Sequence, residues 1–444
     1  MNRKALTIAF VVLIAVAGYG AYVLGYFNRP PKAAFSFRTP TRTLKYIAPT
    51  DRDLITFTNE SSDPETPLEK LISTWYVRYN GTGAWKLLNS STNHWGRLPV
   101  SNEKGHEIRL VVSDGVKEDS KTVAFAVDPS CLPEYPQATL HVQLKGMILN
   151  IGQPKWGDPV KDNLFIDECT RVIREDLGCN AIRIEGSYED KILYAAQRAI
   201  GLGFQQIILN PRHIDASWEE TVKNIRAFAM EAEKLRLRSN AIVLQVGTEL
   251  FVDSTAISKG KTYVERCASI SKTMKDDPRW NEKLTDFINE LIGASSEFFH
   301  GTITYDAAWW EDIKWNRIRT NVICSNEYDE IVRSESVRDA FLRLKAHGRP
   351  VIAGEFGCVT FTGARKYGGY GWSYSGPYDE KEQAESIEHY LRIFNEVGID
   401  GCYLFCVYEP KPDPATEFSV FRIDAGNILR RKLGFYAYQN FVLS

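Results

Sequence analysis

The sequence has no excess of charge of either sign, and it contains few histidines. Its 54 Lys and Arg against 56 Asp and Glu give a formal net charge of -2. The chain as a whole therefore has no electrostatic reason to bind a polyanion, and nucleic acid is not an expected partner. The seven histidines are scattered, and neither an HExxH motif nor a CxxC pair occurs. We therefore expect no metal and no other cofactor.

Glycine-rich phosphate-binding loops are missing as well. Gly201 and Gly203 lack the third glycine of a dinucleotide-binding turn, and they precede a strand-like segment. Residues 260–262 (GKT) have Thr255 at the place where a P-loop has its first glycine. Neither sequence indicates a nucleotide site.

What the sequence does contain is typical of globular protein, with 44% hydrophobic, 25% charged and 12% aromatic residues. Its 444 residues are too many for one ordinary domain. We expect at least two folded units.

Residues 5–27 form an uncharged, mostly apolar run, long enough for a helix to cross about 30 Å of hydrocarbon. Arg3 and Lys4 precede it and favour a cytoplasmic N-terminus, with the rest of the chain outside the membrane. The alternative is a cleaved signal peptide, with 5–14 as its apolar core and 15–17 (AVA) as the cleavage site. We predict a membrane anchor within residues 1–30 and an extracellular-facing protein, which would be secreted if the segment is cleaved.

Asn-x-Ser/Thr glycosylation motifs begin at Asn59, Asn80 and Asn89 and agree with export, although polar loops also produce such triplets by chance. The eight cysteines all lie after residue 130. Their even number permits disulfides, but buried thiols are equally compatible with it.

Residues 31–128 contain short β-type runs separated by Gly, Asn, Asp and Pro, which predicts a small β-sandwich. The runs are 54–58, 73–79, 107–113 and 122–127. Residues 57–64 (FTNESSDP), 73–77 (STWYV) and 108–115 (IRLVVSDG) resemble the immunoglobulin-like PKD modules of extracellular proteins. The resemblance implies a spacer or a surface for contacts with cell-surface proteins, and it makes Trp75 a core residue. Residues 129–139 are Pro-rich and are expected to be a linker.

From residue 140 to 444 strand-like runs alternate with amphipathic stretches, which predicts parallel βα units and favours a (β/α)8 TIM barrel. The eight expected strands are 141–149, 181–184, 205–209, 241–246, 302–304, 321–323, 351–353 and 401–406. The expected helices are 163–177, 190–200, 218–235, 284–299, 336–346 and 380–397. The alternative is a doubly wound open sheet.

Acidic residues stand near the ends of these strands, where a TIM barrel has its active site. They are Glu185, Asp215, Glu249, Asp306, Glu327, Asp329, Glu355 and Glu409. Such carboxylates can bind Mg²⁺ or Ca²⁺, pair with arginines, or act as a general acid and a nucleophile.

We favour Glu249 and Glu355 as the catalytic pair. Each follows an apolar strand and a small residue, in 246–250 (VGTEL) and 351–357 (VIAGEFG). Strands 4 and 7 are three steps apart in a ring of eight, so their end residues face each other across the mouth. Two carboxyl groups about 5–5.5 Å apart are what a retaining glycosidase requires.

The barrel resembles clan A glycoside hydrolases, and most of all family 113, whose known members are β-mannanases. The matching stretches are 180–184 (NAIRI), 208–213 (ILNPRH), 246–250 (VGTEL), 301–305 (GTITY) with Trp309, and 354–357 (GEFG). The resemblance implies that Glu249 is the acid/base and Glu355 the nucleophile. It also implies that Arg183 and Tyr328 hydrogen-bond the nucleophile and keep it ionised.

Some positions depart from the family's pattern. Asp306 and Ala308 replace a small residue and an Asn, Asn210 stands where a Lys is expected, and 404–408 (LFCVY) lack the usual tryptophan. The catalytic pair is intact, but these changes leave the sugar open.

Aromatic residues near the strand ends can stack on sugar rings. With His213, which ends the third-strand motif, the expected substrate-binding residues are Trp309, Trp310, Trp372 and Tyr408. Trp156 and the aromatic loop 367–378 are further candidates.

The sequence thus predicts a retaining β-glycoside hydrolase acting on an extracellular polysaccharide or glycan, of a β-mannan-like kind by resemblance. One alternative is a catalytically silent carbohydrate-binding or cell-surface structural protein. A second is a barrel enzyme whose acidic mouth holds a divalent cation.

Overall fold

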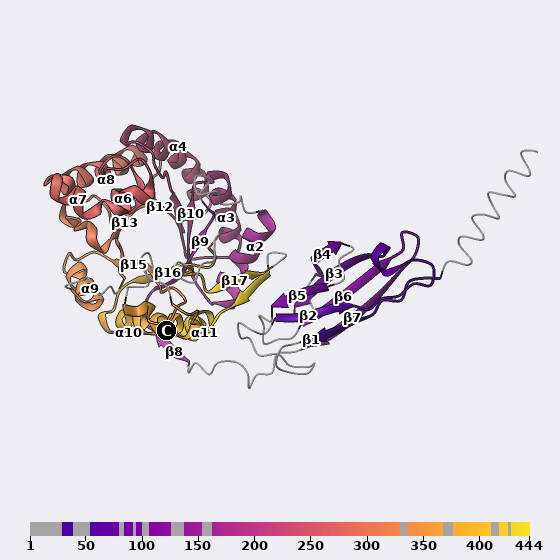
Figure 1. Ribbon diagram of the computed structural model, residues 1–444. Helices are drawn as coiled ribbons and strands as arrows, with labels where there is room; N and C mark the ends of the chain where they lie inside the picture. The colour runs from indigo at the N-terminus through magenta and orange to yellow at the C-terminus, as the bar shows by residue number, and fades with distance from the viewer. Residues whose placement is uncertain are drawn as a thin grey trace, which may run out of the picture. The chain divides into compact units, whose positions relative to one another are not determined.

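The structure is a computed structural model, drawn in Figure 1. It describes residues 29–38, 54–79, 84–91, 95–99, 106–125, 137–152, 162–328, 335–366, 376–409, 417–424 and 428–444. The chain divides into two compact units, Met1–Leu132 with Ile423–Arg430, and Pro133–Arg422 with Arg431–Ser444. The linker bounds 129–139 stay a prediction, because most of these residues lie outside the described ranges.

The first unit contains two antiparallel sheets. One has the order β1 (Phe35–Arg38), β2 (Leu54–Asn59), β5 (Trp95–Pro99), and the other β4 (Lys86–Ser91), β3 (Ile72–Tyr79), β6 (His106–Ser113), β7 (Glu118–Phe125). Alternate residues of β3 and β6 are buried, as expected of strands that present one face to a core. Phe35 packs edge-on against Trp75 across the sheets, with ring centroids 5.1 Å apart. Trp75 is 1% exposed and is a core residue, as predicted.

The Asn59 side chain of the first glycosylation motif is buried and hydrogen-bonded within the fold. Asn59 is 3% exposed, its Nδ2 donates to Ser73 Oγ (2.7 Å), and its Oδ1 accepts from the Ser61 N–H (3.0 Å). The folded chain therefore offers no accessible amide at Asn59 for a glycan, against the expectation from the sequence. Asn80 and the side chain of Asn89 lie outside the described residues.

The second unit is built around a closed barrel of eight parallel strands, which excludes the open-sheet alternative. The strands are β9 (Leu144–Asn150), β10 (Ala181–Gly186), β11 (Gln206–Pro211), β12 (Ile242–Thr248), β13 (Thr302–Ala308), β14 (Ile323–Asn326), β15 (Val351–Phe356) and β16 (Gly401–Leu404). They follow one another around the ring in chain order, and β16 pairs with β9 to close it. The predicted (β/α)8 barrel is confirmed.

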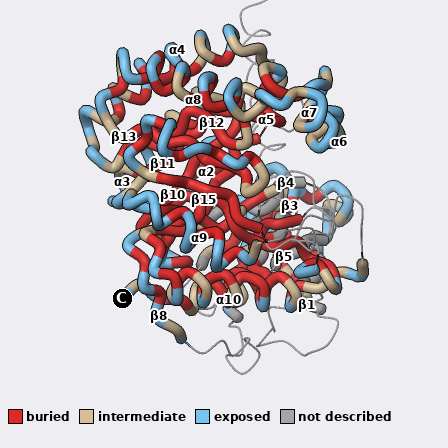
Figure 2. The backbone as a smooth tube through the Cα atoms, turned by 90° about the vertical axis from the view of Figure 1, so that its left-hand side faces the viewer, coloured by how far each residue is buried: buried red, intermediate tan, exposed pale blue. Residues whose placement is uncertain are grey.

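Helices cover the outside of the barrel; most bury one apolar stripe, and the short last helix is buried over most of its length. They are α2 (Asn163–Arg171), α3 (Glu189–Gly201), α4 (Trp218–Arg236), α8 (Trp280–Ser296), α9 (Val337–Lys345), α10 (Glu380–Val397) and α11 (Leu433–Gln439). Figure 2 shows the barrel strands buried along their length while the outer sides of α4 and α10 are exposed. Ser217 and Glu220 form a capping box that fixes the start of α4.

Three short helices were not predicted from the sequence. They are α5 (Leu250–Asp253), α6 (Tyr263–Ala268) and α7 (Ile270–Asp276), and all three lie between β12 and α8. The fully buried Arg266 of α6 donates to the carbonyl oxygens of Val252 (2.6 Å), Gly260 (3.3 Å) and Asp253 (3.0 Å). These bonds fix the backbone of the segment that follows Glu249.

Within the described ranges, no helix is both long and apolar enough to cross a membrane. The expected anchor at residues 5–27 lies outside those ranges and stays a prediction. Of the eight cysteines, seven are described and none of these forms a disulfide; Cys267 is partly exposed and the other six are buried.

Candidate active site

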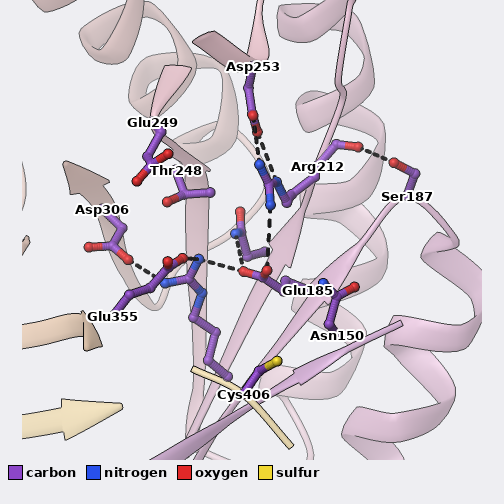
Figure 3. A network of polar contacts seen from close by, with 12 residues as sticks. Asn150, Glu185, Ser187, Arg212, Thr248, Glu249, Asp253, Asp306, Glu355 and Cys406 are labelled. Atoms are coloured by element: carbon purple, nitrogen blue, oxygen red, sulfur yellow. Dashed lines mark hydrogen bonds and ion pairs between the residues drawn. The ribbon is translucent and has the colours of Figure 1, made fainter. Parts of the chain in front are cut away.

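Charged side chains gather at the carboxyl ends of the barrel strands (Figure 3). Arg183 and Glu185 lie two residues apart on β10 and therefore point to the same face of the strand. Asp306 lies on β13, Glu355 on β15, and Glu249 directly follows β12. The barrel thus brings together residues that are up to 172 positions apart in the chain.

Arg183 is fully buried and contacts three carboxyl groups. Its Nη2 donates to Glu355 Oε1 (2.8 Å) and Glu185 Oε2 (2.5 Å). Its Nη1 donates to Asp306 and to the carbonyl oxygen of Gly354 (3.2 Å). These bonds fix the direction of the guanidinium and of the Glu355 carboxyl group.

Glu355 is held at both oxygens. Besides the Arg183 bond to Oε1, Tyr328 Oη donates to Oε2 at 3.3 Å. Glu355 is 6% exposed and Tyr328 1%. Burial raises the pKa of Glu355 to about 7, while the Arg183 guanidinium acts in the opposite direction.

Gly354 is required by the close approach of Asp306. A Cβ at position 354 would lie 2.0 Å from Oδ1 and 2.3 Å from Oδ2 of Asp306. The Asp306 carboxyl group is bonded to Arg183 and cannot move aside without breaking that contact.

Gly354→Ala is therefore expected to lower the free energy of unfolding by roughly 1–3 kcal/mol and to disturb the Arg183 contacts. Gly293→Ala is the matched control, because in α8 nothing lies within 4 Å of the added Cβ. It should leave stability unchanged or raise it by up to about 1 kcal/mol. Chemical denaturation of both variants measures the difference, and equal stability would show that Asp306 moves freely.

Glu249 lies in a different environment from Glu355. Its side chain is partly exposed, and its Oε1 accepts one hydrogen bond, from Asn326 Nδ2 (3.0 Å). Asn326 also donates to Thr248 Oγ1 (3.3 Å). Burial raises the pKa of Glu249 to about 7, against the effect of the Asn326 bond. This environment favours a carboxyl group that keeps its proton near neutral pH.

The two glutamates interact electrostatically. The negative charge of Glu249 is one of the contributions that raise the pKa of Glu355, after burial and alongside Glu185. Two like charges at one mouth disfavour ionisation of both, so the pair retains one proton over a range of pH.

A second arginine, Arg212, pairs with carboxyl groups near the site, one of the roles expected for these acids. It makes two bonds to Asp253, Nε to Oδ2 (2.9 Å) and Nη2 to Oδ1 (2.7 Å), and it lies 3.7 Å from Glu185. Asn210 also donates to Glu185 (3.2 Å). The sequence did not identify Asp253, because it gives no signal for the short helix α5 that carries this residue.

The expected substrate-binding residues have varied surroundings. His213 contacts Glu189 (3.0 Å), with 11% of its own side chain exposed. Trp309 and Trp310 are partly exposed directly after β13. Tyr408 is 5% exposed and packs edge-on against Phe165, which leaves little of its ring for a sugar. Trp372 and Trp156 lie outside the described residues.

The other strand-end acids have local partners. Asp215 pairs with Arg266 (2.5 Å), Glu327 accepts from Ser325 Oγ (2.6 Å), and Glu409 accepts from the Phe418 N–H. Asp329 lies outside the described residues. In the part of the chain that the structure describes, no group of three or more His, Cys, Asp or Glu residues is arranged to hold a metal ion.

No protein-family model matches the chain, and no curated protein matches it either. Among solved structures it is similar to a β-1,4-mannanase of glycoside hydrolase family 113, at 15% identity over 68% of this chain and 98% of the other, with a TM-score of 0.44. It is also similar to a β-D-glucuronidase of Dictyoglomus thermophilum (12% identity, 93% and 68% covered, TM-score 0.40). A family 39 glycoside hydrolase of Bacteroides cellulosilyticus matches at 11% identity, with 83% and 76% covered and a TM-score of 0.45.

Proposed function

We propose that this protein is a retaining β-glycoside hydrolase, with Glu355 as the nucleophile and Glu249 as the acid/base. The observation that supports this most is the contrast between the two carboxyl groups at one mouth. Glu355 is buried and bonded at both oxygens, whereas Glu249 is partly exposed and accepts one hydrogen bond. Burial raises the pKa of both to about 7, so the pair shares one proton near neutral pH. A fixed nucleophile and a proton-carrying acid are what double displacement needs.

In the first step, an oxygen of Glu355 attacks the anomeric carbon as the bond to the leaving oxygen breaks. Glu249 transfers its proton to that oxygen, so the aglycone leaves as a neutral alcohol. The sugar remains attached to Glu355 as an ester of inverted configuration.

In the second step, Glu249 is ionised and takes a proton from water as the water oxygen attacks the anomeric carbon. The ester bond breaks, Glu355 is released as a carboxylate, and the sugar leaves with the configuration it had in the substrate. Both glutamates return to their starting protonation states.

Arg183 helps to keep Glu355 ionised. Burial raises the pKa of Asp306 to about 8, despite its contact with Arg183. Of the three acids on Arg183, Glu185 has a lowered pKa, because Arg183 and Arg212 outweigh its burial, whereas burial raises the pKa of Glu355 and Asp306. The Arg183 guanidinium is shared between Glu185 and Glu355, and its bond to Glu355 Oε1 favours the ionised form of the nucleophile.

The expected substrate is an extracellular β-linked polysaccharide or glycan of a β-mannan-like kind, with Trp309 and Trp310 as sugar platforms. Both residues are partly exposed directly after β13, and the Trp310 ring packs edge-on against Phe251. The silent carbohydrate-binding alternative is less favoured, because Glu249, Glu355, Arg183 and Tyr328 form a complete catalytic set.

A screen of β-linked oligosaccharides, with reducing-end analysis and NMR of the first-formed anomer, tests the proposal. We expect new reducing ends and a β product. An α product would exclude retention, and failure to cleave any substrate while binding some would favour the silent alternative. Activity that disappears on chelation would instead indicate the divalent-cation enzyme.

A further inference from the structure

The backbone directly after Glu249 is held by two side chains that the proposed reaction does not use. The Leu250 N–H donates to Tyr305 Oη (3.1 Å), and the Phe251 N–H donates to Glu311 Oε1 (3.1 Å). Tyr305 lies on β13 and Glu311 in the turn that follows it. Both residues are 0% exposed.

Glu311 also organises its own surroundings. Its Oε2 accepts from Tyr305 Oη (2.7 Å) and from the Ala308 N–H (3.0 Å). The carboxyl group thus links the end of β13, the Tyr305 hydroxyl group and the start of α5. These three donors offset the desolvation cost of burying the carboxyl group and fix its position.

The backbone of Glu249 requires such support. It has φ 46° and ψ 43°, in the left-handed region. A non-glycine residue in this region costs about 1–3 kcal/mol and persists only where the surroundings enforce it. Three consecutive N–H groups are held, since the Glu249 N–H itself donates to the carbonyl oxygen of Asp306 (3.1 Å).

We propose that Glu311, together with Tyr305, is a positioning residue that directs the Glu249 side chain at the leaving oxygen by holding the two N–H groups that follow it. This inference rests on the proposed role of Glu249 as acid/base. Asn326 bonds only one of the Glu249 oxygens, so the direction of the carboxyl group depends on the backbone. A shift of about 1 Å in a reacting group can cost about 10²-fold in rate.

The test uses Glu311→Gln and Tyr305→Phe, with kcat/KM measured on two glycosides of the sugar that the parent prefers. One has 2,4-dinitrophenol as its leaving group, which departs without protonation. The other has phenol, whose oxygen must be protonated by the general acid as it leaves. We expect the phenyl glycoside to lose about 10²-fold and the dinitrophenyl glycoside less than about 5-fold, because only the first needs an aligned acid. Glu282→Gln on the exposed side of α8 is the control and should change neither value.

General damage to the barrel would lower kcat/KM equally for both glycosides, and that result would overturn the inference. The inference would also be overturned if both variants kept the parent's ratio of kcat/KM between the two glycosides and the parent's thermal unfolding temperature. Tyr305→Phe keeps the carboxyl group and provides the answer if Glu311→Gln does not fold. If Glu249→Ala itself shows no dependence on the leaving group, the proposed function fails instead, and the two failures are therefore distinguishable.

Discussion

Glu355→Ala is expected to reduce kcat by roughly 10⁵–10⁶-fold on every substrate, which is the scale of removing a nucleophile. Among the residues that the structure describes at this mouth, we expect no other carboxyl group to take its role. Glu185 and Asp306 are fully buried and bonded to Arg183. The loss is measured by steady-state kinetics on a dinitrophenyl glycoside. Glu219→Ala, an exposed position in α4, is the control and should keep parent activity.

Azide added to Glu355→Ala should restore part of the turnover, because the removed carboxylate leaves space on the attacked face of the sugar. The product would form by a single displacement, so the glycosyl azide should be inverted relative to the substrate. A retained azide from this variant, or full activity without azide, would assign the nucleophile to another residue. Asp306 and Glu409 would be the next to test.

The barrel was predictable because its strands are apolar runs that alternate with helices of clear hydrophobic periodicity. The errors are at the strand ends. The run ending at Ile184 continues as β10 to Gly186, and the run ending at Thr304 continues as β13 to Ala308. The backbone ladder continues beyond the apolar residues, as Glu185 pairs with Asn210 of β11. A hydrophobic pattern therefore ends where the polar site begins, although the strand does not.

The candidate site was predictable only in part. The strand ends and the family resemblance indicated Glu249, Glu355, Arg183 and Tyr328, which lie at one mouth. The sequence did not indicate the contacts that Glu311 and Asn326 make with the Glu249 region, because these contacts depend on the left-handed turn after β12. No period or propensity reveals that turn, since it is imposed by tertiary hydrogen bonds on a residue that disfavours it.

Glu249→Ala is expected to separate substrates by their leaving group. The kcat/KM of a phenyl glycoside should fall about 10²–10⁴-fold, which is the usual contribution of a general acid. The kcat/KM of a dinitrophenyl glycoside should change little, because its leaving oxygen needs no proton. Its kcat should still fall, since water must then attack the ester without a base, and the glycosyl-enzyme should accumulate to an extent that mass spectrometry can measure.

The pH dependence and azide complete the test of Glu249. In the parent, burial raises the pKa of Glu249 to about 7, so the acid form is present below that pH and lost as the pH rises through it. The resulting basic limb of kcat/KM for the phenyl glycoside should be absent in Glu249→Ala. Azide should attack the accumulated ester, raise kcat on the dinitrophenyl glycoside and give an azide of retained configuration, the opposite of the Glu355→Ala product. Equal losses on both glycosides, or an inverted azide, would remove Glu249 from the role of acid/base.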